Sequence, residues 1–127
     1  MHWLRGLPGV GCQNAAAALN FSTMNRRVLV VDGHVHRVCR RLGLVGRTSD
    51  VDQAYEALMA AVPEAWTAED LYELHWLLNR LGQRTCHFGT PSCNSCVLKS
   101  VCPRIDAEAR PTAEVAAFPT RPQLQLI

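Results

Sequence analysis

The sequence is poor in lysine and in aromatic residues, and it has no long apolar run. Lys99 is the only lysine, and Phe, Trp and Tyr together make up 6% of the 127 residues. No apolar stretch approaches the ~20 residues of a transmembrane helix, so we expect no membrane span. The first residues lack the apolar core of a secretory signal peptide. We therefore expect a protein of the reducing cytoplasm, where clustered cysteines usually serve metal binding or catalysis.

The sequence also shows no internal repeat and no convincing strand pattern. Apolar residues instead recur at helical spacing after polar helix-start residues, for example Val51, Ala54 and Leu58 after Asp50. The length allows one small domain, and the pattern predicts an all-α fold. The expected helical segments are residues 1–6, 12–19, 33–42, 51–62 and 67–83.

The strongest chemical signal is a run of four cysteines with the spacing C-x6-C-x2-C-x5-C. The four are Cys86, Cys93, Cys96 and Cys102. A single run that supplies four thiolates is one known way of holding a [4Fe-4S] cluster, and the spacing favours that cofactor. Structural zinc usually takes two close cysteine pairs. Zinc and disulfides remain the alternatives. Cys12 and Cys39, outside the run, are expected to be buried small apolar residues.

A glycine-rich turn, Leu7-Pro8-Gly9-Val10-Gly11, separates the first two helical segments. Glycine permits close approach of the backbone to a ligand, and a helix N-terminus presents aligned N–H donors to a phosphate. The turn is thus a candidate for backbone contacts to nucleic acid phosphates, which position a duplex without reading its sequence. An ordinary turn between helices is the alternative.

The glycine turn, the small-residue helix after it, the segment 31–38 and the cysteine run stand in an order that resembles one known family. They are similar to the endonuclease III branch of the helix-hairpin-helix DNA glycosylases, over roughly residues 1–103. The resemblance implies a helix-hairpin-helix and helical bundle over 1–83 and a [4Fe-4S] loop over 84–103. The weakly patterned segment 104–127, with three prolines, is expected to be a linker or a disordered tail. The resemblance also implies DNA contacts from the turn residues Leu7, Gly9, Val10 and Gly11.

This family excises damaged or mispaired bases in base-excision repair after flipping the nucleotide out of duplex DNA. The family aspartate maps onto Asp32, which would stabilise the positive charge that develops on the deoxyribose. Asp32 is also well placed as a helix N-cap. Bifunctional members carry a lysine where this chain has Gln13. An amide cannot form a Schiff base, so the resemblance implies a monofunctional glycosylase without lyase activity.

The resemblance leaves further alternatives and a missing part. The alternatives are a catalytically inactive DNA-binding fragment, a mismatch adenine glycosylase relative, and a small zinc-stabilised interaction domain. Family members place most of a helical barrel ahead of the hairpin, so a separate N-terminal half is an expected partner beside double-stranded DNA. If bacterial, the protein is expected at the nucleoid. Trp66 and Trp76 are expected to pack in the core.

Overall fold

The structure, a computed structural model, describes residues 1–104, and that part of the chain is helical without strands. The elements are α1 (His2–Arg5), α2 (Cys12–Asn20), α3 (Gly33–Arg41), α4 (Val51–Ala61), α5 (Ala68–Arg84) and the 3₁₀ turn η1 (Cys93–Ser95). The predicted all-α fold is confirmed. None of the described helices is both long and apolar enough to cross a membrane. The tail predicted to be disordered lies, from residue 105 onward, outside the described residues.

Three helices begin at the polar residues that the sequence indicated. The Asp32 side chain accepts a hydrogen bond from the Val35 N–H at 2.8 Å, which makes it the N-cap of α3. Asp50 and Thr67 each form a capping box with the residue three positions on, and Asp70 fills that role for Thr67. Each such cap satisfies backbone donors that a helix start leaves unpaired, and contributes about 1 kcal/mol.

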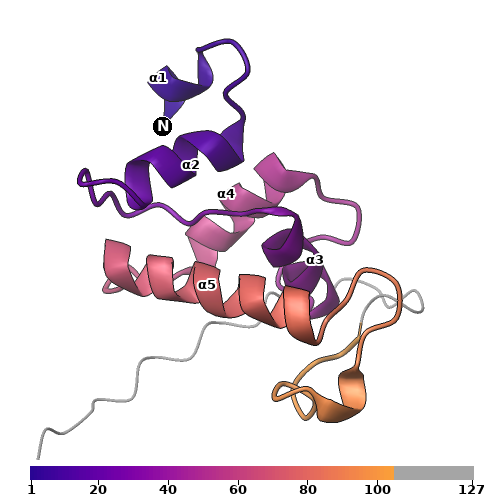
Figure 1. The fold of residues 1–127 in the computed structure, drawn as a ribbon. Coiled ribbons are helices and arrows are strands. Elements are labelled where there is room, and N and C mark those ends of the chain that lie inside the picture. The colour runs from indigo at the N-terminus through magenta and orange to yellow at the C-terminus, as the bar shows by residue number, and fades with distance from the viewer. Residues whose placement is uncertain (105–127) are drawn as a thin grey trace, which may run out of the picture.

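Helices α3 and α5 form the most extensive helix–helix contact of the body (Figure 1). Gly82 lies in this contact, because a Cβ built there would stand 2.9 Å from the His34 Cβ. The sequence suggested that α5 ends near this glycine, but the helix continues to Arg84. Gly82 therefore permits close approach of two helices rather than ending one. The largest fully buried side chains are Leu29, Val31, Val35, Val38, Cys39, Leu58 and Leu71.

The connection between α2 and α3 runs between α2 and α5 and places the start of α3 in the middle of the molecule (Figure 1). Two polar anchors hold this connection. The Asn20 amide donates to the Ala68 carbonyl at 3.0 Å, and Arg27 donates to the carbonyls of Trp66 and Pro63. The cysteine loop follows α5 and lies beyond its C-terminal end. The fold therefore brings the Asp32 region and the loop to opposite ends of the short helix α3.

Candidate functional site

The cysteine loop encloses a cavity of about 370 Å³. All four cysteines of the run line it, in the order Cys86, Cys93, Cys96 and Cys102. Burial raises the pKa of the Cys102 thiol, a backbone contact at Arg104 lowers it, and the charges of the other three cysteines raise it further. The four thiols therefore line the same cavity and lie close enough for their charges to affect one another. None of the six cysteines of the chain forms a disulfide, so the disulfide alternative is not supported.

Two arginines of α3 tie the loop to the helical body. Arg37 donates to the carbonyls of Gly82 and Cys86 at 2.8 and 3.0 Å. Arg41, of which only 5% is exposed, donates to the Cys86 sulfur at 3.2 Å and to the His87 carbonyl at 2.6 Å. Hydrogen bonds from a charged group are stronger than neutral ones. Here they provide donors for carbonyl groups that would otherwise lack a partner within the loop.

Four thiols around one cavity form a donor set for a soft metal centre, and both a zinc ion and an iron–sulfur cluster take such ligands. A zinc ion would draw four sulfurs to about 2.3 Å from one centre. Within residues 1–104, no three His, Cys, Asp or Glu side chains converge closely enough to ligate one ion. The cysteines nevertheless surround a common cavity next to the positively charged Arg41. Soft thiolates spread around a cavity, with a cationic donor at one sulfur, fit an iron–sulfur cluster.

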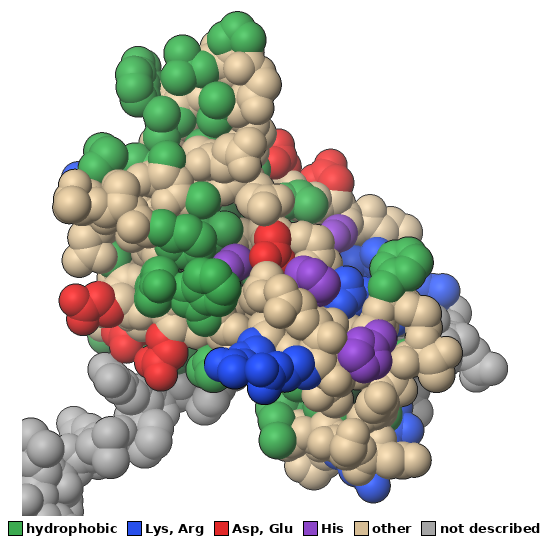
Figure 2. All heavy atoms as spheres, viewed as in Figure 1, with side chains coloured by type: hydrophobic (Ala, Val, Ile, Leu, Met, Phe, Trp, Pro, Cys, Tyr) green, Lys and Arg blue, Asp and Glu red, His purple; other side chains and the backbone are tan. Residues whose placement is uncertain are grey.

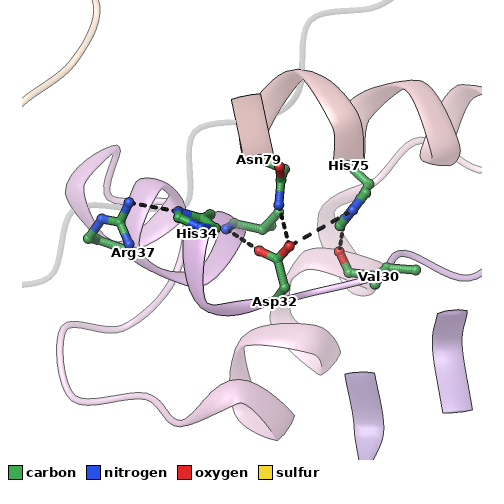
Figure 3. A network of polar contacts seen from close by, with 7 residues as sticks. Val30, Asp32, His34, Arg37, His75 and Asn79 are labelled. Atoms are coloured by element: carbon green, nitrogen blue, oxygen red, sulfur yellow. Dashed lines mark hydrogen bonds and ion pairs between the residues drawn. The ribbon is translucent and has the colours of Figure 1, made fainter. Parts of the chain in front are cut away.

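Asp32 lies at the start of α3 and is held from two helices (Figure 3). One carboxylate oxygen accepts the Val35 N–H of its own helix, and the other accepts the Asn79 side-chain amide of α5 at 2.5 Å. The Nε2 atom of His75 lies 3.9 Å from that second oxygen. The side chain of Asp32 is 15% exposed, so the carboxylate is mostly buried yet still reaches the surface.

The glycine turn has the conformation that its sequence requires. Pro8 and Gly9 are its two central residues, and the Val10 N–H donates to the Leu7 carbonyl at 3.1 Å. Gly9 has a φ of 79°, which a residue with a Cβ rarely adopts. Gly11 then caps α2 without a side-chain hydrogen bond. The first N–H groups of α2 therefore start next to an exposed turn, as the sequence suggested for a phosphate contact.

Gln13 does not join the hydrogen bonds around Asp32 in the described structure. It lies on the first turn of α2 and is exposed, whereas the polar contacts of Asp32 come from Val35, Asn79 and His75. The structure thus places Gln13 beside the glycine turn. The cysteine loop, the carboxylate and the turn form three separate regions of one helical body.

Comparison with known proteins finds several relatives named for endonuclease III. Endonuclease III-like protein 1 of Gallus gallus is 36% identical over 98 residues, which are 76% of this chain and 34% of that protein. The Endonuclease III homolog of Encephalitozoon cuniculi is 37% identical over 102 residues, 79% of this chain and 40% of that protein. No protein-family model matches the chain.

Solved structures agree with the sequence relatives. A trapped covalent intermediate of endonuclease III with DNA superimposes with a TM-score of 0.68 and 29% identity over 81% of this chain. The chain is endonuclease III-like. The resemblance read from the motifs is thereby confirmed for the part that the chain spans. That part is 46% of the solved endonuclease III chain and less than half of the curated relatives named above.

The endonuclease III-like chain exposes an aromatic face between α2 and α5. Phe21, Tyr72 and Trp76 are 40%, 45% and 47% exposed, and their rings touch one another. Figure 2 shows hydrophobic side chains gathered on this face beside a histidine and an acidic side chain. The prediction that Trp76 packs in the core was wrong, because it lies on the solvent side of α5. Trp66 is half-buried against the core, as expected.

The sequence reasoning assigned no role to four polar residues around these sites. They are Arg37, Arg41, His75 and Asn79, and all four act through contacts 45 or more positions away in the chain. The signal was present in part. His75 and Asn79 interrupt the apolar face of α5 one turn apart, between Leu71 and Gly82. A polar pair on a buried helical face indicates partners elsewhere in the fold.

Proposed function

We propose that this chain carries the catalytic carboxylate, the DNA-binding turn and the cluster loop of a base-excision repair DNA glycosylase. The substrate is duplex DNA with a damaged or mispaired base, and the reaction is hydrolysis of the N-glycosidic bond. The observation that carries the proposal is Asp32, a mostly buried carboxylate fixed at a helix start within a fold that matches endonuclease III with a TM-score of 0.68.

The chemistry assigned to Asp32 is electrostatic. As the bond from C1′ to the base nitrogen breaks, its electron pair leaves with the base and positive charge develops on the sugar. A fixed carboxylate stabilises that charge without having to reorganise. The oxygen of a water molecule then bonds to C1′, and its proton passes to the carboxylate or to solvent. Gln13 supplies no amine, so no Schiff base forms and the DNA strand stays intact.

The glycine turn would bind the phosphate backbone of DNA. The exposed backbone of Gly9 and Gly11 and the first N–H groups of α2 would donate to phosphate oxygens. Leu7, 45% exposed, and Val10 flank these donors. Such contacts would fix the register of the protein on the duplex, while base choice would depend on the residues around Asp32.

The four cysteines of the loop would hold a [4Fe-4S] cluster. A bound cluster would supply structural cross-linking of the loop, because four residues of an irregular segment would share one rigid group. Arg41 would donate to the Cys86 thiolate and offset part of the negative charge. Protein purified without oxygen should be brown and contain about four irons per chain.

We assign to the aromatic face the binding of a polypeptide partner. The chain spans 46% of the solved endonuclease III, so the remaining part of that fold has no counterpart in the described residues. Three touching aromatic rings beside the Asp32 region form an apolar surface that a helical segment can cover. A separate N-terminal half would pack on Phe21, Tyr72 and Trp76 and cover this surface.

The test is release of bases from a panel of lesion-bearing and mismatched duplexes, with two matched variants. Asp32→Asn removes the charge and leaves one accepting oxygen for two donors, the Val35 N–H and the Asn79 amide, so base release should fall about 100-fold or more and stability by about 1–3 kcal/mol. Asp50→Asn makes the same change at another N-cap, far along the chain, and should be as active as the unchanged protein. Borohydride should trap no covalent adduct, and equal activity of Asp32→Asn would refute the assignment.

Because the chain spans only part of its relatives' length, a second candidate function is that of a DNA-binding fragment without catalysis. Such a fragment would bind duplex DNA with a steep salt dependence, because phosphate contacts release counterions. It would release no base, even in the presence of a completing N-terminal polypeptide. Base release under either condition separates the first candidate from the second.

A further inference from the structure

The two oxygens of the Asp32 carboxylate are held by different parts of the chain. Oδ1 accepts the Val35 N–H at 2.8 Å, which fixes it to the first turn of α3. Oδ2 accepts the Asn79 Nδ2–H at 2.5 Å, which fixes it to α5. An N-cap alone leaves the second oxygen free to turn. With the amide in place, rotation of the carboxylate would break a charge-assisted hydrogen bond.

Asn79 is too deeply buried to act as a surface contact. Only 7% of it is exposed, and it lies among the buried residues of α5. A polar group in such a position costs free energy unless it is hydrogen-bonded. The specific consequence of having an amide at this position is the bond to Asp32.

His75 confines the same oxygen from a second side (Figure 3). Its Nδ1 lies 2.9 Å from the Val30 carbonyl, which can only accept, so Nδ1 carries a hydrogen. Nε2 therefore faces Asp32 Oδ2, at 3.9 Å. The rings of Phe21 and Trp76 pack against the imidazole, with ring centres 5.1 and 5.2 Å from its own.

We propose that Asn79 is a positioning residue that sets the orientation of the Asp32 carboxylate, with His75 as the second wall of the same clamp. This role rests on the proposed function, in which Asp32 faces the sugar. Asn79 itself touches neither DNA nor the reacting atoms. It acts by holding Oδ2, so that the carboxylate meets the developing positive charge in one fixed orientation.

The kinetic test compares two replacements of Asn79. Asn79→Asp keeps the shape but removes the donor and sets a carboxylate against Asp32, and Asn79→Leu keeps similar volume without polarity. Both should lower kcat for base release by about 10- to 100-fold. KM should change less than about 3-fold, because a buried residue does not bind the duplex. Asn25→Asp makes the same charge change at an exposed loop position and should leave kcat unchanged.

A double variant separates positioning from stability. Asp32→Asn combined with Asn79→Asp reverses donor and acceptor, so the hydrogen bond can form again. The thermal midpoint should recover toward that of the unchanged protein, whereas base release should stay absent because the carboxylate has moved to α5. Folded Asn79→Asp and Asn79→Leu proteins that both keep the original kcat would overturn the role of Asn79.

A measurement independent of activity uses the side-chain amide of Asn79 in ¹⁵N-labelled protein. Its hydrogen-bonded N–H should give a displaced, slowly exchanging signal that moves on Asp32→Ala and stays in place on Asp50→Ala. If this occurs and the unchanged protein releases no base, the proposed function fails while the orientation of Asp32 by Asn79 stands. An Asn79 signal indifferent to Asp32→Ala overturns the inference itself.

Discussion

The helical body and the cysteine loop are held together in different ways. In the body, side chains such as Leu71 and Val35 are fully buried, and α3 and α5 approach as closely as Gly82 allows. In the loop after Cys86, large apolar side chains point into solvent, with Phe88 and Val97 85% and 86% exposed. The body therefore contains its own hydrophobic core, whereas the loop contributes almost nothing to one.

The difference indicates which interactions stabilise each region. Burial of apolar surface stabilises the body, at roughly 25 cal/mol per Å². The loop is held by hydrogen bonds from Arg37 and Arg41. Under the proposed cluster assignment, folding of the loop is coupled to cluster binding, whereas folding of the body is not. Four experiments test this difference between the body and the loop.

Loss of one cluster ligand should have the largest effect and should be confined to the loop. In Cys96→Ser, a hydroxyl replaces a soft thiolate, so bound iron should fall from about four atoms per chain to nearly none. Residues 86–102 should lose protection from hydrogen exchange, while the circular dichroism of the helices changes little. Cys39→Ala is the matched control and should keep its iron. Full iron content in Cys96→Ser would refute the ligand assignment.

Removal of the Arg41 anchor should come next. Arg41→Met leaves the His87 carbonyl and the Cys86 sulfur without their donor, which should cost about 3 kcal/mol in the free energy of unfolding. Urea denaturation measures the loss, and exchange should rise first in the loop. Arg84→Met, an exposed arginine at the end of α5, should change stability by less than about 0.5 kcal/mol. Equal effects of the two variants would show that the anchor contributes nothing.

A methyl group at Gly82 should disturb the body instead. In Gly82→Ala the added carbon would stand 2.9 Å from the His34 Cβ, so α3 and α5 must move apart. We expect a loss of about 2 kcal/mol by urea denaturation, as for other overpacked cores. Gly33→Ala meets no atom within 4 Å and should be neutral or slightly stabilising. Unchanged stability in Gly82→Ala would contradict the close helix contact.

The smallest expected effect is a pH dependence from Cys39. Burial raises the pKa of its thiol from 9.0 to about 12. Between these values the unfolded thiol has lost its proton and the folded one has not. The free energy of unfolding therefore falls as the pH rises through this window, by about 1 kcal/mol at pH 10. Cys39→Ala should lose less stability than the unchanged protein between pH 7 and pH 10, and identical losses would contradict this account.

Much of the fold was predictable because its signals are local. The caps at Asp32, Asp50 and Thr67 begin the helices where the sequence indicated, and the turn at Gly9 adopts the positive φ that only a glycine takes easily. These features depend on residues three or four positions apart. The cysteine spacing likewise predicted a shared site, and the four cysteines do line one cavity.

The candidate site was predictable only in part. Asp32 was found from a motif, but its contacts to Asn79 and His75 join residues more than 40 positions apart, and no local rule pairs them. The exposure of Trp76 was missed for a related reason. Helical periodicity groups residues by face but does not say which neighbouring faces a fold leaves uncovered. The roles in catalysis and DNA binding stay predictions.

By itself, the sequence determined the helices, their polar starts, the glycine turn and the thiolate run, since each depends on the covalent and steric preferences of near neighbours. The tertiary structure alone decided that Asp32 is clamped between α3 and α5, and that Arg41 reaches the Cys86 sulfur. It also left the aromatic rings of α5 exposed. These outcomes require distant segments to be brought together, and burial of the shared core supplies that driving force.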